Sequence, residues 1–232
     1  PTNPKGYKAL FERRAALIPT LRMQKALAAE DRAAVEPFPV HGTAKGILRR
    51  TVQILKRHRD VHFLEVVEEI APISIIITTL AAQSYEYCVK SFVFDSELDV
   101  LIATIRLMPH FIDKPVVNGR RIYVVANETT VGENFAERWN TEPARAAAFY
   151  EWHAKALADF EALPDLQGID VIGKSLEGSL GSSVVRKVID ARTDSISQAR
   201  TAKKLYVAPT VGLTLSSAAN ATPVRSNTFF GD

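Results

Sequence analysis

The stretch from residue 72 to residue 90 is nearly all apolar or small, and it constrains the fold more than any other feature of the chain. A helix with apolar residues all round must be buried on most of its faces. The run Ile75-Ile-Ile77 would suit a strand equally well on periodicity, but the length of the segment and its alanine-rich continuation favour a helix. The sequence therefore predicts a mainly α-helical core that contains residues 72–90.

The segment before it, residues 45–62, has the pattern of an amphipathic helix. On a helical wheel of about 100° per residue, four cations fall in one stripe beside the apolar face: Lys45, Arg49, Lys56 and Arg59. A cationic stripe in that position can line a cleft wall, where the lower dielectric strengthens the hold on a phosphate. The commoner meaning of such a run of charges is a solvated helix face, and composition alone favours that alternative.

Ser74 is expected in the first turn of the helix that Pro72 introduces. Free backbone N–H groups and the helix dipole favour an anion at such a position, and the Ser74 hydroxyl can donate to a phosphate. A serine at a helix start more often caps the helix or bonds back to its own backbone. Both roles remain open for Ser74.

Two further residues, a histidine and a cysteine, have side chains that often take part in catalysis, but both are predicted to be structural. His58 falls inside the apolar arc of the 45–62 helix, which indicates a core or boundary histidine with satisfied hydrogen bonds. Cys88, the one cysteine of the chain, lies in an apolar stretch and is predicted to be a buried thiol.

The rest of the chain is predicted to be helical with one short strand and a flexible end. Helices are expected at 4–16, 98–108, 133–139, 143–163 and 174–192, and a strand at 121–125. A short helical stretch at 21–32 lies between prolines. From about Pro209 the chain is rich in Ser, Thr, Ala and Gly, so residues 206–232 are predicted to be a flexible tail.

Composition limits which kinds of binding partner and which cellular location are expected. A net charge of +3 over 232 residues fits one local basic patch better than a nucleic-acid-binding surface. The cations of the 45–62 helix also have no aromatic residues among them. Nucleic acid is therefore not an expected partner. One cysteine allows no internal disulfide. No apolar run reaches the ~18 residues that span a bilayer, so no membrane partner and a cytoplasmic location are expected.

The order of these features resembles the second lobe of bacterial cGAS/DncV-like nucleotidyltransferases (CD-NTases), which make cyclic oligonucleotide messengers. In that superfamily a helical lobe follows a catalytic sheet. One of its helices has a lysine that contacts the nucleotide triphosphate, and the start of the next helix supplies a serine or similar group. Leu55-Lys56 and Pro72-Ile73-Ser74 look like these two elements.

Two further segments support the resemblance, which runs from about Asn3 to Arg192. Asn3-Pro-Lys-Gly-Tyr7 resembles the junction that follows the catalytic lobe. Asn134-Phe-Ala-Glu-Arg-Trp139 resembles a family segment of the form Asn-Phe-Ala-(acid)-(base)-Trp. The resemblance implies a junction with the catalytic lobe at 1–44, a helical C-terminal lobe at 45–205 and the tail at 206–232.

The resemblance also implies what the protein binds and does. The parent would be a synthase, α+β overall, that joins ATP or other NTPs into a cyclic oligonucleotide for CBASS-type antiphage signalling. Lys56 and Ser74 would contact the triphosphate, with Arg49 and Lys45 as further candidates. Mg²⁺ would be held by an Asp-x-Asp pair and a third carboxylate of the catalytic lobe, and this chain has no Asp-x-Asp. The chain is therefore expected to be the C-terminal part of the synthase, to pair with its own N-terminal catalytic lobe and to be inactive alone.

The end of the chain suggests one more partner. Some CD-NTase operons resemble ubiquitin-like systems that join the synthase to a target through a C-terminal glycine. Here Phe229 and Phe230 precede Gly231, and Asp232 would have to be removed before Gly231 could be conjugated. An uninformative chain end explains these residues equally well.

A non-enzymatic function is the alternative to the synthase. A helical module that binds nucleotide or a protein partner would be stable and soluble by itself. A fragment of a synthase would instead expose an apolar face where the other lobe packs.

Overall fold

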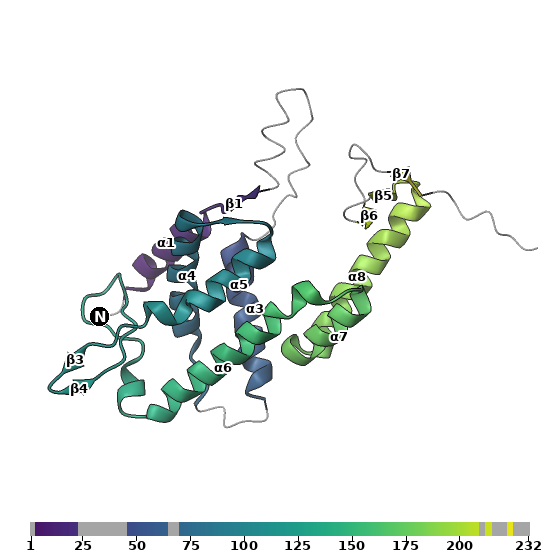
Figure 1. The fold of residues 1–232 in the computed structure, drawn as a ribbon. Helices are drawn as coiled ribbons and strands as arrows, with labels where there is room; N and C mark the ends of the chain where they lie inside the picture. Colours follow the sequence, from purple (N-terminus) through teal and green to yellow (C-terminus); the bar gives the residue numbers. More distant parts are fainter. Residues whose placement is uncertain (1–2, 23–45, 65–69, 209–211, 215–221, 225–232) are drawn as a thin grey trace, which may run out of the picture. The chain divides into compact units, whose positions relative to one another are not determined.

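The computed structural model describes residues 3–22, 46–64, 70–208, 212–214 and 222–224. The chain forms two compact units, Pro1–Gln167 and Gly168–Asp232. Helices make up most of the described part of both units, as Figure 1 shows, which confirms the predicted mainly α fold. None of the described helices has the length and apolarity that a membrane span requires.

The first unit consists of long helices joined by short turns and two small pairs of strands. Its α-helices are α1 (Pro4–Ala15), α3 (Ile47–His62), α4 (Ser74–Ser91), α5 (Glu97–Leu107) and α6 (Pro143–Glu161). Its 3-10 turns are η2 (Met108–Phe111), η3 (Glu137–Asn140) and η4 (Leu163–Asp165). Strand β1 (Thr20–Leu21) pairs in parallel with β2 (Val93–Phe94), and β3 (Val116–Val117) pairs antiparallel with β4 (Arg120–Arg121).

Helix α4 is the centre of the first unit, as the apolar stretch 72–90 predicts. It packs against α1, α3 and α5. Seven of its residues have at most 1% of their surface exposed: Ile76, Ile77, Leu80, Ala81, Ser84, Tyr85 and Cys88. Complete burial of a large aliphatic side chain contributes about 1.5–3 kcal/mol, so this one helix supplies much of the driving force for folding. The prediction of a buried thiol at Cys88 is confirmed.

Helix α3 is amphipathic, as its sequence predicts. Its buried residues recur at helical spacing: Leu48, Thr51, Val52, Leu55 and His58. This face packs against α4 and α6. Because the apolar face is fixed, the cations of α3 lie at its borders, where they can reach the neighbouring helices.

The expected helix at 133–139 and strand at 121–125 are wrong in most of their length. Regular structure there is limited to the 3-10 turn η3, to Arg121 at the end of β4 and to isolated bridges at Val124 and Asn134. The Asn134 side chain accepts hydrogen bonds from the backbone N–H groups of Val125 and Ala136, both at 2.9 Å, and donates to the carbonyl of Tyr123 at 2.9 Å. These bonds replace the backbone pairs that a helix or a longer strand would need.

The expected single helix at 174–192 is two helices in the structure. The second unit contains α7 (Ile169–Leu180), α8 (Ser182–Thr201) and a small antiparallel sheet in the order β6 (Gly212–Thr214), β5 (Tyr206–Ala208), β7 (Thr222–Pro223). Gly181 separates the helices with φ 85° and ψ 137°. A residue with a Cβ rarely adopts a positive φ of this kind, so the glycine ends the helix despite the continuous apolar spacing.

Replacing Gly181 by alanine is expected to destabilise the second unit by about 1–3 kcal/mol, the usual cost of a strained backbone conformation. Gly178→Ala is the matched control. Gly178 lies inside α7, and a Cβ there would meet nothing within 4 Å, so this change is expected to be neutral or stabilising. Urea unfolding of both variants measures the difference. Equal stability of the two would contradict the role of Gly181.

Candidate functional site

The end of α3 and the start of α4 are joined through Arg59. Its Nη1 donates to the carbonyl oxygen of Pro72 at 2.9 Å and to Ser74 Oγ at 3.1 Å. Its Nε and Nη2 donate to Asp60 Oδ1 at 2.8 and 2.5 Å. The Arg59 side chain is only 17% exposed. Two candidate elements that are separated in the sequence therefore meet at one guanidinium.

Ser74 is the first residue of α4, and its side chain is exposed. Ile73 occupies the N-cap position, and no side chain caps this helix start. The capping role that the sequence left open for Ser74 is therefore not the one seen. Since Ser74 Oγ accepts a hydrogen bond from Arg59, its own hydroxyl hydrogen is left to donate elsewhere. A hydroxyl donor and a helix start together suit an anion.

Lys56 lies one turn before Arg59 on α3 and is half-buried. Among the described residues its amino group has no hydrogen-bond or ion-pair partner. Burial lowers the pKa of Lys56 below its ordinary value, and the neighbouring Arg59 charge lowers this pKa further, while Asp60 opposes the shift. A bound anion would stabilise this partly desolvated ammonium, which lies next to a second cation, more than it would stabilise a fully solvated one.

The other two candidate cations do not join this group. Arg49 forms an ion pair with Glu12 of α1, so its charge holds α1 against α3. Lys45 lies outside the described residues, as does Gly231 of the proposed conjugation site. The structure thus joins Arg59 of the cationic stripe to Ser74 at the helix start, and Lys56 lies one turn from Arg59 on the same helix.

His58 is a core residue with both ring nitrogens bonded, as its position on the wheel predicts. Trp152 Nε1 donates to His58 Nδ1 at 3.0 Å, and His58 Nε2 lies 3.1 Å from Asp159 Oδ2. Since indole N–H is a donor only, Nδ1 is the acceptor and the ring proton resides on Nε2. Burial lowers the pKa of His58, and the bond to Asp159 opposes that shift. The histidine therefore stays neutral and holds α3 against α6.

One charged cluster, at Arg14 of α1, was not predicted from the sequence. This residue is 7% exposed, and it forms ion pairs with Glu86 at 2.6 Å and with Glu128 at 2.7 Å. It also lines an open cavity of about 740 Å³ together with Gly6, Ala9, Leu10, Arg13, Glu128 and Thr129. Spacing could have given the signal, because Arg14 follows Tyr7 and Leu10 at helical intervals on the face that contacts α4.

The acidic residues around α5 serve structural roles. Asp95 pairs with Arg22, and Glu97 pairs with Arg50. Asp99 accepts a hydrogen bond from Ser96, the N-cap of α5. In the part of the chain that the structure describes, no group of three or more His, Cys, Asp or Glu side chains is arranged to hold a metal ion.

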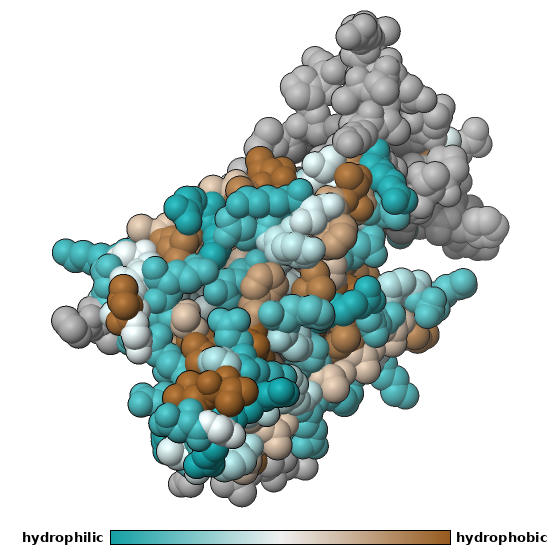
Figure 2. All heavy atoms as spheres, turned by 60° about the vertical axis from the view of Figure 1, so that its left-hand side comes forward, coloured by the Kyte–Doolittle hydropathy of each residue, from teal (hydrophilic) through white to brown (hydrophobic). Residues whose placement is uncertain are grey.

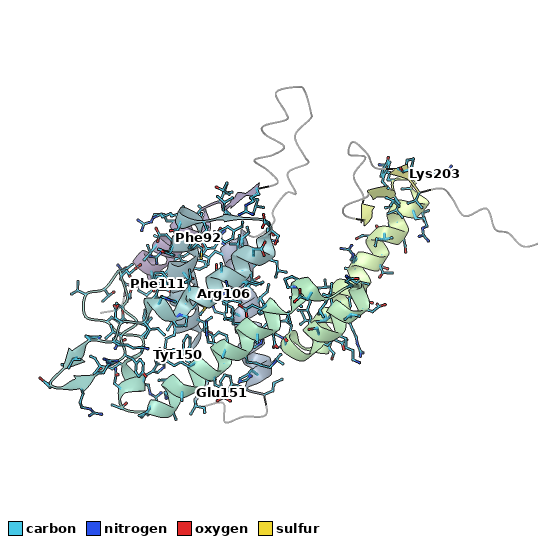
Figure 3. All side chains as sticks on the ribbon, viewed as in Figure 1. Phe92, Arg106, Phe111, Tyr150, Glu151 and Lys203 are labelled. Atoms are coloured by element: carbon cyan, nitrogen blue, oxygen red, sulfur yellow. The ribbon has the colours of Figure 1, made fainter. Side chains whose placement is uncertain are left out.

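An aromatic cluster remains on the surface of the first unit. The Tyr87 ring centroid lies 5.9 Å from that of Phe92 and 6.2 Å from that of Phe111, and Tyr87 and Phe92 are 49% and 45% exposed. Figure 3 labels Phe92 and Phe111, and Figure 2 shows how brown apolar patches alternate with hydrophilic ones on another view of the molecule. Tyr87 and Phe92 are thus exposed aromatic side chains that pack against each other.

Comparison with known proteins shows what the chain is similar to. No protein-family model matches the chain. Over all 232 residues the chain is 27% identical to a c-di-GMP synthase of Roseivirga ehrenbergii. Its fold is similar to that of the CD-NTase CdnG of Bradyrhizobium diazoefficiens, solved in complex with GTP, with a TM-score of 0.53 and 19% identity over 82% of the chain. The chain is therefore similar in sequence to a c-di-GMP synthase and in fold to a CD-NTase.

Both similarities support the resemblance to the CD-NTases that the sequence predicted. The chain spans 57% of the length of the Roseivirga synthase and 55% of the CdnG chain. The similarity to CdnG applies to the fold, and the roles of individual residues rest on the geometry described above.

Proposed function

We propose that this chain supplies a triphosphate-binding surface of a cyclic oligonucleotide synthase. The observation that carries the proposal is the half-buried side chain of Lys56, whose amino group has no hydrogen-bond or ion-pair partner among the described residues. Lys56 lies one turn before Arg59, the residue that bonds to the start of α4. Lys56 would neutralise part of the triphosphate charge, and the Ser74 hydroxyl would donate to a phosphate oxygen. The positive end of the α4 dipole lies at the same helix start and also favours a bound phosphate.

GTP is the nucleotide that the comparisons favour for a first test. The name of the Roseivirga relative indicates a guanine product, and CdnG was solved with GTP. ATP and other NTPs remain proposed substrates on the family resemblance. Among the described residues the carboxylates do not form a Mg²⁺ site, so the proposal concerns the binding of the triphosphate by Lys56 and Ser74.

The wider role follows from the family and is part of the proposal. The metal-binding carboxylates would come from an N-terminal catalytic lobe, so this chain would be the C-terminal part of the synthase and inactive alone. The parent would act in the cytoplasm in CBASS-type antiphage signalling. Conjugation through Gly231 to a partner of the ubiquitin-like kind stays a prediction, and mass spectrometry of the chain end in cells would test it.

Replacing Lys56 by alanine is expected to weaken GTP binding by about 1.5–3 kcal/mol, the range for hydrogen bonds to charged groups. Isothermal titration of the full-length protein with GTP measures the change. Lys56→Met, which keeps the aliphatic stem and removes only the charge, is expected to lose almost as much.

Arg50→Ala is the matched control for the loss of a cation from α3. Arg50 pairs with Glu97 across an exposed contact, so its removal is expected to change GTP affinity by less than about twofold. Unchanged affinity in both Lys56 variants would refute the assignment of the phosphate site.

A further inference from the structure

Arg59 uses nearly all of its hydrogen-bonding capacity inside the protein. A guanidinium has five N–H donors in a fixed plane. Four hydrogen bonds engage four of them: two to Asp60 Oδ1, one to the Pro72 carbonyl and one to Ser74 Oγ. The side chain is mostly buried at 17% exposure, and the adjacent carboxylate offsets its charge. These contacts leave Arg59 poorly placed to grip a phosphate itself.

The same contacts fix the direction in which Ser74 can donate. A serine hydroxyl rotates freely unless a neighbour occupies one of its lone pairs. Arg59 Nη1 donates to Ser74 Oγ and to the Pro72 carbonyl just before it, so it holds both the side chain and the backbone of the helix start. With the lone pair that faces Arg59 occupied, the hydroxyl hydrogen points away from the guanidinium.

The geometry points to Arg59 as a positioning residue that orients the Ser74 hydroxyl and the first turn of α4 toward a bound phosphate. Asp60 holds the guanidinium in place from the other side. This inference rests on the proposed phosphate site and adds a separate statement to it: Arg59 acts through Ser74 and not by direct contact with the nucleotide. Preorganised donors of this kind raise affinity because less freedom is lost on binding.

A double-mutant cycle on the full-length protein tests the inference, with inorganic tripolyphosphate and GTP as probes. Arg59→Gln is expected to weaken the binding of both probes by about tenfold, because the phosphate group is common to them. In a Ser74→Ala background the same Arg59 change is expected to cost less than about threefold, since only the first turn of α4 is then left for Arg59 to position. Arg50→Gln on the same helix is the control.

Three outcomes would overturn the positioning role. The first is an equal loss of affinity from Arg59→Gln in the parent protein and in the Ser74→Ala background. The second is a loss of affinity in Arg59→Gln no larger than that in Arg50→Gln. The third is unchanged affinity in Ser74→Ala. Arg59→Lys takes the place of Arg59→Gln if the latter fails to fold. Its ammonium keeps the charge but cannot hold Asp60, Pro72 and Ser74 in one plane, so a loss of at least about threefold is expected.

The cycle separates this inference from the proposed function. Unchanged affinity for tripolyphosphate and GTP in Lys56→Ala would refute the phosphate site as assigned. A loss in Lys56→Ala with additive effects of Arg59 and Ser74 would leave the site in place and refute only the positioning role.

Discussion

Replacing Trp152 by alanine is expected to lower the free energy of unfolding by about 3–5 kcal/mol. The indole is completely buried on α6, where its ring lies against Phe149 and His58 at centroid distances of 5.9 and 6.2 Å. Alanine would leave a large cavity and would remove the N–H donor of His58 Nδ1. Both losses fall on the contact between α3 and α6, so the helix that carries Lys56 would be affected.

Trp152→Phe separates the two losses. Phenylalanine fills most of the space but has no N–H, so about 1–3 kcal/mol is expected from the unsatisfied nitrogen of His58. Glu151→Ala, at the exposed neighbouring residue labelled in Figure 3, is the control and is expected to change stability by less than about 0.5 kcal/mol. Urea unfolding measures all three. A Trp152→Ala variant as stable as the Glu151 variant would refute the packing role.

The same variants have an expected pH dependence. Because burial lowers the pKa of His58 in the folded state, the unfolded chain binds a proton more readily. The protein therefore loses stability as the pH falls below the ordinary value of 6.5. In Trp152→Phe the freed Nδ1 can accept a proton, so the loss of stability below that pH should be smaller than in the parent protein.

Arg14→Met is expected to destabilise the protein by about 3 kcal/mol, the lower end of the range for a broken buried ion pair. The guanidinium joins Glu86 of α4 to Glu128, and its side chain is 9% exposed. Methionine keeps the apolar stem, so the change removes the charge and leaves two carboxylates without that cation. The larger exposure of Glu128, at 37%, limits the effect because water can solvate it.

Arg106→Met is the matched control for Arg14. Arg106 and Glu161 are 58% and 40% exposed, and an exposed ion pair of this kind contributes at most about 1 kcal/mol. Thermal or urea unfolding of the two variants gives the comparison. If the Arg14 variant lost no more stability than the Arg106 variant, the ion pairs of Arg14 with Glu86 and Glu128 would contribute no more than an exposed pair.

Acid should also distinguish the Arg14 variant. Hydrogen bonds from Lys90 and then from Arg14 lower the pKa of Glu86 below its ordinary value of 4.5. The stabilisation from the ionised form is present above that value and is lost as the pH falls through the folded-state pKa. Without Arg14 this contribution is smaller, so less stability remains to be lost in acid.

Local pattern was enough to predict the helices that carry the site. The apolar stretch that became α4 and the i, i+3, i+4 spacing of α3 both record which faces are buried, since hydrophobic periodicity reflects the geometry of a helix. The Asn3-Pro4 helix start is likewise a local signal, and the Asn3 side chain accepts a hydrogen bond from the Gly6 N–H at 2.9 Å. The order of the motifs around Lys56 and Ser74 also gave the resemblance to the CD-NTases that the comparisons support.

The errors occurred where a single residue overrides periodicity. Asn134 takes backbone hydrogen bonds from two segments, and Gly181 adopts a positive φ within an otherwise regular apolar pattern. Both signals are present in the sequence, but their effect depends on which backbone groups lie nearby. Hydrophobic periodicity, which averages over several residues, does not detect the effect of one such residue.

The sequence by itself determined that cations border the buried face of α3 and that a serine begins the next helix. Only the tertiary structure decided which of those cations is used by the protein. Arg49 meets Glu12 of α1, Arg59 reaches Ser74 and Pro72, and Lys56 is left without a partner among the described residues. A helical wheel fixes the direction of a side chain, whereas an ion pair depends on what another helix places within about 4 Å of it.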